Sequence, residues 1–155
     1  MSDTAPRRTR RTARILLLGQ DGRLLLFRYV APGFDPFWIM AGGECDPGED
    51  YPAAARRELR EETGIDAQPL PLGITRQADY VYAGEPVQAI EHFFVHRTDT
   101  ATIDTSGHTE LEREVMQEHR WFTRVEIGSW PETIYPQEIL ELIERALDRH
   151  GGIAA

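Results

Sequence analysis

The order of apolar and polar positions predicts extended segments in the first third of the chain. Residues 12–18 and 23–28 are apolar-rich, and the turn residues 19–22 between them are typical of a β-hairpin. A Pro/Gly loop at 31–36 and a short apolar segment at 37–40 follow. The chain therefore begins with strands rather than with a helix.

A helix is predicted from residue 50 or 51 to residue 63, because this stretch is rich in Ala, Leu, Arg and Glu. Pro52 suits the first turn of a helix, where no backbone N–H is needed. Gly64 is expected to end the helix in the left-handed conformation, which glycine adopts without steric cost.

The second half of the chain predicts a longer hairpin, a loop, and further elements. Apolar residues recur at helical spacing from Ile139 to Leu147, which predicts an amphipathic C-terminal helix that ends near Gly151. The full set of expected elements is strands at 71–82 and 87–97, a loop at 98–109, a helix at 110–118, a strand at 121–127 and this last helix. Strands mixed with two long helices indicate an α+β or mixed α/β sandwich.

The length of 155 residues fits one domain, which we place at residues 12–151. Residues 1–11 then form a basic, flexible N-terminal tail, and residues 152–155 a short C-terminal tail. No apolar run reaches the 18 or more residues that a membrane span needs, so no membrane partner is expected. The single cysteine, Cys45, excludes an internal disulfide and fits a cytoplasmic protein.

A formal charge of −9 argues against bulk binding to a nucleic acid backbone, which requires a basic surface. All 17 basic residues are arginine, so catalysis through a lysine Schiff base and the lysine-dependent phosphate loop are both excluded. A polyanionic ligand would therefore need a bridging cation.

Three carboxylates are expected on one side of the predicted helix at 51–63. At 100° per residue, Glu58, Glu61 and Glu62 fall within an arc of about 100°. A solvated acidic face is the usual explanation of such a run, but Glu58 and Glu62 are like charges at i,i+4 and repel. Mg²⁺ takes carboxylate oxygens together with water and phosphate, which makes a metal site the better interpretation. Arg57 is placed to brace the carboxylates.

The segment from Gly43 to Ile65 resembles the Nudix box, G-x5-E-x7-R-E-U-x-E-E-x-G-U, in which U is a bulky aliphatic residue. Every specified position matches, through Gly43, Glu49, Arg57, Glu58, Leu59, Glu61, Glu62, Gly64 and Ile65. Ala41 departs from the proline that many members have before the two glycines, at a place where only a backbone oxygen is needed.

The resemblance implies an α/β/α sandwich with a mixed β-sheet and hydrolysis of a nucleoside diphosphate linked to another moiety, with Mg²⁺ or Mn²⁺ as cofactor. It implies that Glu49 and Arg57 orient the carboxylates, while the metal ligands are Glu58, Glu61, Glu62 and the carbonyl of Gly42. Members often add a glutamate from a later region, for which Glu112, Glu114 and Glu118 all qualify. The general base stays open among the glutamates of the box and one from elsewhere.

Other functions remain as alternatives. A catalytically silent ligand sensor with the same fold is one, although such proteins usually carry a broken box. An isoprenoid diphosphate isomerase would need a catalytic cysteine outside the box, where the sequence has none. The nucleotide itself is not specified; Tyr82 and Trp38 are candidates for binding it. Monomer and homodimer both stay open.

Overall fold

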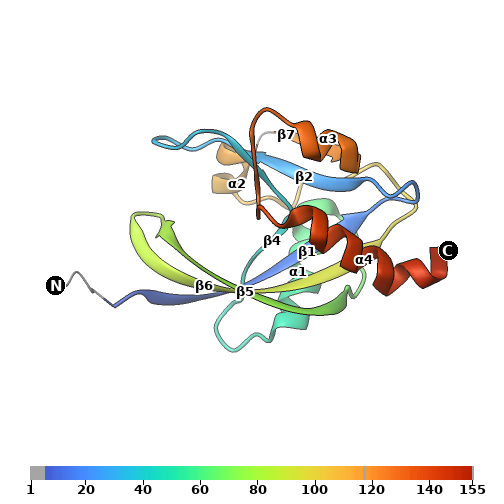
Figure 1. Ribbon diagram of the computed structural model, residues 1–155. Helices are drawn as coiled ribbons and strands as arrows, with labels where there is room; N and C mark the ends of the chain where they lie inside the picture. The colour runs from blue at the N-terminus through green and yellow to red at the C-terminus, as the bar shows by residue number, and fades with distance from the viewer. Residues whose placement is uncertain (1–5, 117, 155) are drawn as a thin grey trace.

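A curled eight-stranded mixed sheet with helices on both faces forms the frame of the protein (Figure 1). The computed structural model describes residues 6–116 and 118–154. The strand order is β5-β6-β1-β2-β3-β8, with β4 paired to β1 and β7 paired to β2. The strands are β1 (Arg8–Leu18), β2 (Leu24–Tyr29), β3 (Phe37–Ile39), β4 (Ala41–Glu44), β5 (Leu70–Tyr82), β6 (Glu85–Arg97), β7 (Glu118–Phe122) and β8 (Thr133–Tyr135). The helices are α1 (Tyr51–Thr63), α2 (Glu110–Val115), α3 (Arg124–Ser129) and α4 (Ile139–Ala154).

Strand β1 organises the sheet, because it pairs with β6 in parallel and with β2 and β4 in antiparallel orientation. Its side chains alternate between the two faces. Ile15 and Leu17 enter the apolar cluster that holds α1, whereas Leu16 and Leu18 enter the cluster that holds α4. Helices thus cover both faces of the mixed sheet, which confirms the expected sandwich.

Strands β1 and β2 are paired only where Leu18 faces Leu24. Nearer its N-terminus β1 instead pairs with β4, and β2 pairs with β7 (Figure 1). The glycines of β4 are therefore held against β1 at residues 12–15, beside helix α1. This arrangement positions the candidate site.

Helix α1 forms as the sequence predicts. The Asp50 carboxylate caps it by accepting a hydrogen bond from the Ala53 N–H, and Pro52 lies in its first turn. Gly64 ends it with a φ of 79°, and the Gly64 N–H donates to the Arg60 carbonyl. Ala55 and Leu59 are buried toward the sheet.

The expectation of a flexible tail over residues 1–11 is wrong for Arg8–Arg11, which belong to β1 and pair with Val87–Ile90 of β6. Arg8 is held there by Glu44 and Glu85, so the basic run is extended by ion pairs that its own sequence does not reveal. Residues 1–5 lie outside the described part of the chain.

Three expected elements differ at the C-terminal half. The expected strand at 121–127 ends at Phe122, because Thr123 and Glu126 form a capping box that begins α3. The helix expected at 110–118 ends at Val115, and β8 has no counterpart in the expected elements. Helix α4 runs past Gly151 to Ala154, into the segment expected as a C-terminal tail, and residue 155 lies outside the described chain. Within residues 6–116 and 118–154, no helix has the length and apolar character needed to cross a bilayer.

Gly42→Ala should destabilise the protein strongly. Gly42 has a φ of 145°, and a Cβ there would overlap the Ala13 carbonyl oxygen and lie 2.9 Å from the Arg14 Cα. Strain and overlap together are expected to lower the free energy of unfolding by about 2–5 kcal/mol in urea titrations. Gly84→Ala is the matched control, because Gly84 also has a positive φ of 80° but no heavy atom within 4 Å. Equal losses for the two variants would contradict this account of β4.

Candidate active site

Three carboxylates from two helices converge beside β4. Glu58 and Glu62 lie one turn apart on α1, and Glu112 comes from α2. Each offers an oxygen within 4.8 Å of an oxygen of the other two. Glu58 and Glu62 are only 7% and 1% exposed, and Glu112 is half-buried. Three negative charges so close together in a buried place require a positive counterpart.

Glu62 is the innermost of the three. Its Oε1 accepts a hydrogen bond from the Gly42 N–H at 3.1 Å, whereas its Oε2 is buried and has no hydrogen-bond partner within the described chain. Burial raises the pKa of Glu62 well above its ordinary value, and the neighbouring charges of Glu58 and Glu112 raise it further. Burial also raises the pKa of Glu58. Both shifts mean that the ionised pair is unfavourable without a cation.

The second glycine of β4 lets the backbone approach Glu58. A Cβ at Gly43 would lie 2.8 Å from the carboxyl carbon and both carboxylate oxygens of Glu58. Any larger residue would therefore push the carboxylate away from the cluster. The Gly42-Gly43 pair is explained by this close approach on one side and by β1 on the other.

Arg57 joins Glu58 of this group to Glu49 and Glu61. Its guanidinium donates to both oxygens of Glu49 at 2.9 Å, to Glu58 Oε1 at 2.9 Å and to Glu61 Oε1 at 3.1 Å. It also donates to the carbonyl of Glu44 on β4 at 3.0 Å. Arg57 lowers the pKa of Glu49, and the Glu49 contacts raise the pKa of Arg57. This residue ties helix, loop and strand together around the carboxylates.

The loop before α2 brings Glu112 into the site. A His108 ring nitrogen lies 3.0 Å from the Glu62 carbonyl, and Gly107 packs against the backbone of Glu61. Thr109 and Glu112 then form a capping box that begins α2. The loop is thus anchored to the end of α1. Helix α2, which follows the loop, therefore places the Glu112 carboxylate beside α1.

The remaining predicted ligands lie elsewhere. The Glu61 carboxylate is half-buried, bonded to Arg57, and does not belong to the group of three. Glu118 is exposed on β7, and Glu114 is exposed on α2; neither joins the group. Among the downstream glutamates, the structure therefore brings only Glu112 into this cluster.

Of the two aromatic candidates, Trp38 does not offer a surface for a ligand. Its ring is 1% exposed and packs edge-on against Phe122 and Trp130, and its N–H donates to Glu132 Oε1 at 2.8 Å. Trp38 is a core residue. Tyr82 is half-buried, with the Arg10 guanidinium 4.0 Å from its ring centre.

Sequence reasoning missed a row of charges on the same face of β1 as Leu16 and Leu18. Arg10 and Arg14 lie there with Thr12 between them, and Arg14 pairs with the buried Glu91 of β6. The sequence offers little signal for these positions, because residues 8–12 are all polar and do not alternate with apolar ones.

Comparisons with known proteins agree on one family. The NUDIX domain model matches residues 8–144. An RNA pyrophosphohydrolase of Sphingopyxis alaskensis is 28% identical over 135 residues, which cover 80% of this chain and 82% of that protein. A second RNA pyrophosphohydrolase, from Erythrobacter litoralis, is 29% identical, and the aligned residues cover 83% of this chain and 83% of that protein. The crystal structure of a MutT protein from Methanosarcina mazei Go1 has the same fold, with a TM-score of 0.66 and 21% identity over 95% of this chain and 98% of that one.

Mg²⁺ should stabilise the folded protein, and Glu62→Gln should reduce that effect. At a concentration ten times its Kd, a cation that binds only the folded chain adds about 1.4 kcal/mol to the free energy of unfolding. This corresponds to a rise of roughly 3–6 °C in Tm. In chelator the variant should melt higher than the wild type, since it removes one of two repelling buried charges. Differential scanning calorimetry with EDTA and with Mg²⁺ measures both effects. An unchanged Mg²⁺ increment in the variant would speak against Glu62 as a ligand.

Glu132→Gln should destabilise the protein at pH 7 more than at pH 3. The Arg28 and Trp38 hydrogen bonds lower the pKa of Glu132 to about 2. The carboxylate therefore stabilises the fold fully when the pH is above the ordinary pKa of a glutamate, and this contribution is lost as the pH falls toward 2. We expect a loss of about 1 kcal/mol at pH 7 that shrinks in acid, measured by urea unfolding at several pH values. Glu144→Gln, an exposed change of the same charge on α4, should show no such trend.

Proposed function

The chain belongs to the NUDIX domain family, and from this membership we propose that it hydrolyses a pyrophosphate bond in a nucleoside diphosphate linked to another moiety. It is then a divalent-metal-dependent pyrophosphohydrolase. The observation that carries the proposal is the group of the buried Glu58 and Glu62 with the half-buried Glu112, in which one oxygen of Glu62 has no partner in the described chain. The relatives named RNA pyrophosphohydrolase support the type of bond.

The residues present fit a hard cation. Carboxylate oxygens are the ligands that Mg²⁺ prefers, and Mn²⁺ accepts the same donors. Glu58, Glu62 and Glu112 would hold the ion, with the carbonyl of Gly42 as the further oxygen that the family pattern suggests. When bound, the ion would neutralise the diphosphate, lower the pKa of a coordinated water and stabilise charge on the leaving oxygen. We propose Mg²⁺, with Mn²⁺ as a substitute.

The protein's own groups position the reaction. Arg57 fixes the Glu58 and Glu61 carboxylates and ties them to Glu49, so the donor oxygens are oriented before substrate binds. A carboxylate oxygen of the site accepts the proton that the attacking water loses. Glu112 lies on a separate helix, so its replacement would leave Glu58 and Glu62 of α1 in place.

The catalytically silent sensor is the weaker alternative, because binding alone does not call for three clustered carboxylates, two of them buried and one held by an arginine. We also propose a cytoplasmic location, which the single buried Cys45 supports. A homodimer stays a prediction, and light scattering after size exclusion would test it.

Activity should vanish in excess chelator and return with Mg²⁺ or Mn²⁺. Among single variants, Glu58→Gln and Glu62→Gln should lower kcat most, by more than about 100-fold, because each removes a ligand. Glu49→Gln and Arg57→Gln should cost about 10- to 100-fold, since these residues orient the ligands. Phosphate release from a nucleotide panel measures all of these effects.

Glu112→Gln separates the roles within the cluster, with Glu118→Gln as the exposed control. If Glu112 is the general base, its variant loses kcat while its Mg²⁺ affinity stays close to that of the wild type. If it is a ligand, both fall. Turnover that persists in chelator, or Glu62→Gln at full activity, would defeat the proposed mechanism.

A further inference from the structure

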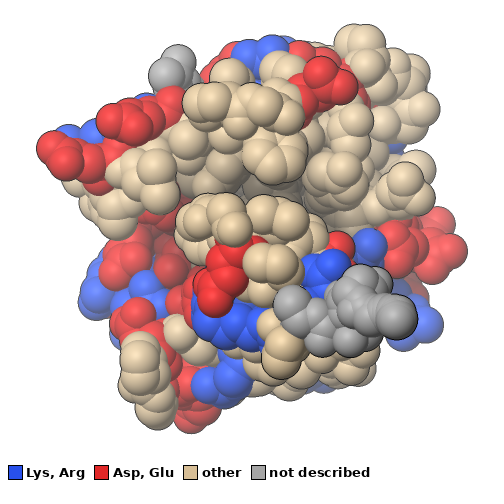
Figure 2. All heavy atoms as spheres, turned by 90° about the vertical axis from the view of Figure 1, so that its left-hand side faces the viewer, with Lys and Arg blue, Asp and Glu red and all other residues tan. Residues whose placement is uncertain are grey.

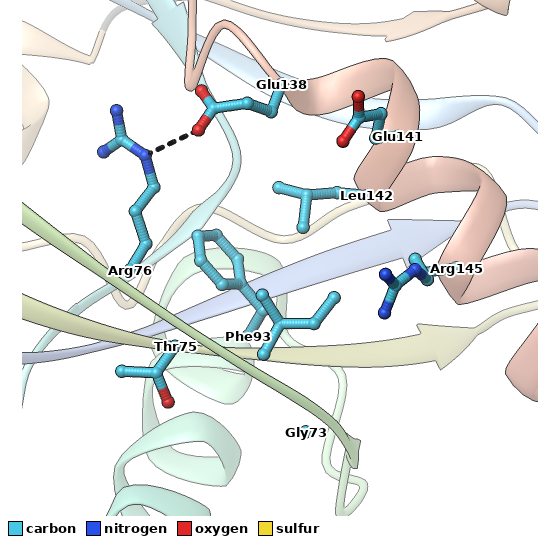
Figure 3. Close-up of a pocket in the computed structure, with 9 residues that line it drawn as sticks. Gly73, Thr75, Arg76, Phe93, Glu138, Glu141, Leu142 and Arg145 are labelled. Carbon is cyan, nitrogen blue, oxygen red and sulfur yellow. Dashed lines mark hydrogen bonds and ion pairs between the residues drawn. The ribbon is translucent and has the colours of Figure 1, made fainter.

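Charged side chains on the surface of the protein mostly lie in mixed groups. The formal charge is −9, and Figure 2, which looks onto the side where the β5–β6 turn lies, shows acidic and basic side chains intermixed. A pocket of about 380 Å³ between β5, β6 and α4 follows the same pattern (Figure 3). Two arginines and two glutamates line it, and Arg76 and Glu138 among them form an ion pair. Balanced charges of this kind do not select an anion or a cation.

A second pocket, of about 320 Å³, differs because no carboxylate lines it. It lies where β2 and β7 meet the loop before α2 and the end of that helix. Its lining combines two apolar side chains with four that carry hydrogen-bonding groups, namely Phe27, Met116, Thr105, His108, Arg113 and His119. An arginine among neutral groups gives a lining of positive charge, which favours an anion.

The two histidines of this pocket are held by contacts within the protein. Both rings lie edge-on to Phe27, with ring centres 5.6 Å away for His108 and 6.0 Å away for His119. His108 is 6% exposed, and its Nε2 lies 3.0 Å from the Glu62 carbonyl oxygen. A carbonyl oxygen can only accept, so Nε2 donates and Nδ1 is the acceptor of the neutral ring. The pocket thus has ordered imidazoles before any ligand binds.

Arg113 is the cation of the pocket. Its Nη2 donates to the Ser106 carbonyl at 2.9 Å, which holds the guanidinium against the loop that carries Thr105 and His108. Within residues 6–116 and 118–154 this guanidinium forms no ion pair. A guanidinium has five N–H donors in a planar fork that suits the oxygens of a phosphate ion. Arg113 therefore keeps both its charge and donors for an anion.

The neutral groups of the lining add both donors and acceptors. Burial lowers the pKa of His119, and the neighbouring His108 lowers it further, against a smaller effect of Glu118. The His119 ring is therefore neutral at pH 7, with one N–H and one acceptor nitrogen. Orthophosphate at this pH has oxygens that accept from a guanidinium or hydroxyl and an O–H that donates to an imidazole nitrogen. Sulfate has no such O–H, so the lining suits phosphate better.

We propose that this second pocket binds orthophosphate, with Arg113 as its cation and Thr105 and His119 as hydrogen-bonding partners. No member of the carboxylate cluster lines the pocket, so the site is separate from the proposed hydrolysis and does not depend on it. A phosphate ion held by Arg113 of α2 and His119 of β7 would join these two elements.

Isothermal titration calorimetry with sodium phosphate tests the site. EDTA is present throughout, so that no residual metal at the carboxylate cluster can bind the ion. The wild type should bind with a Kd of about 1 mM or lower. Arg113→Gln should weaken binding by at least about 10-fold, and Thr105→Val, which removes only the hydroxyl from a side chain of similar shape, by about 2- to 10-fold. Arg124→Gln, an exposed change of the same charge on α3, should stay within about twofold of the wild type.

The titration has outcomes that would overturn the assignment. One is a wild type that binds no phosphate at about 10 mM. Another is a loss for Arg113→Gln no larger than that for Arg124→Gln, or unchanged binding in Thr105→Val. Sodium sulfate at the same ionic strength should bind at least about 10-fold more weakly, as expected for one lost hydrogen bond to a buried group. Equal affinity for sulfate would make the pocket a general anion site and refute the choice of phosphate.

Discussion

The close approach of two helical carboxylates to the glycines of β4 is the constraint on which the rest of the site depends. Glu58 and Glu62 are buried against a backbone that has no side chain at residues 42 and 43, and β1 lies directly behind that backbone. Nothing larger than glycine fits between the two. The sheet, the helix and the clustered carboxylate oxygens are thereby fixed to one another, and the burial of their charge is unfavourable without a cation.

Arg57 makes this arrangement tolerable in the absence of a cation. One guanidinium contacts Glu49, Glu58, Glu61 and the carbonyl of Glu44, so a single positive charge partly offsets three carboxylates. It does not reach the Glu62 oxygen that has no hydrogen-bond partner in the described chain. Arg57 therefore offsets the charge of Glu58 and Glu61, whereas Glu62 is left without a positive partner in the described chain.

Ion pairs between arginines and carboxylates recur in the rest of the protein. Its basic residues are all arginine, and many are held by carboxylates from distant elements, as Arg28 is by Glu132 and Arg76 by Glu91 and Glu138. These pairs tie strands to neighbouring elements, including residues 8–11 of β1.

The sequence by itself determined the family resemblance, helix α1 and its caps, the β5–β6 hairpin and the α1 carboxylates, because each depends on residues close together in the chain. Local sequence patterns did not predict the structure where contacts with residues distant in the chain determine it. The basic run at 8–11 becomes a strand only through β6, and the short strand β8 only through β3. The choice of Glu112 over Glu114 and Glu118 depends on a loop anchored to the end of α1, and the burial of Trp38 on aromatic partners far along the chain. Tertiary packing alone decided these points, since burial and ion pairing act between residues whose separation in the sequence carries no information about their distance in space.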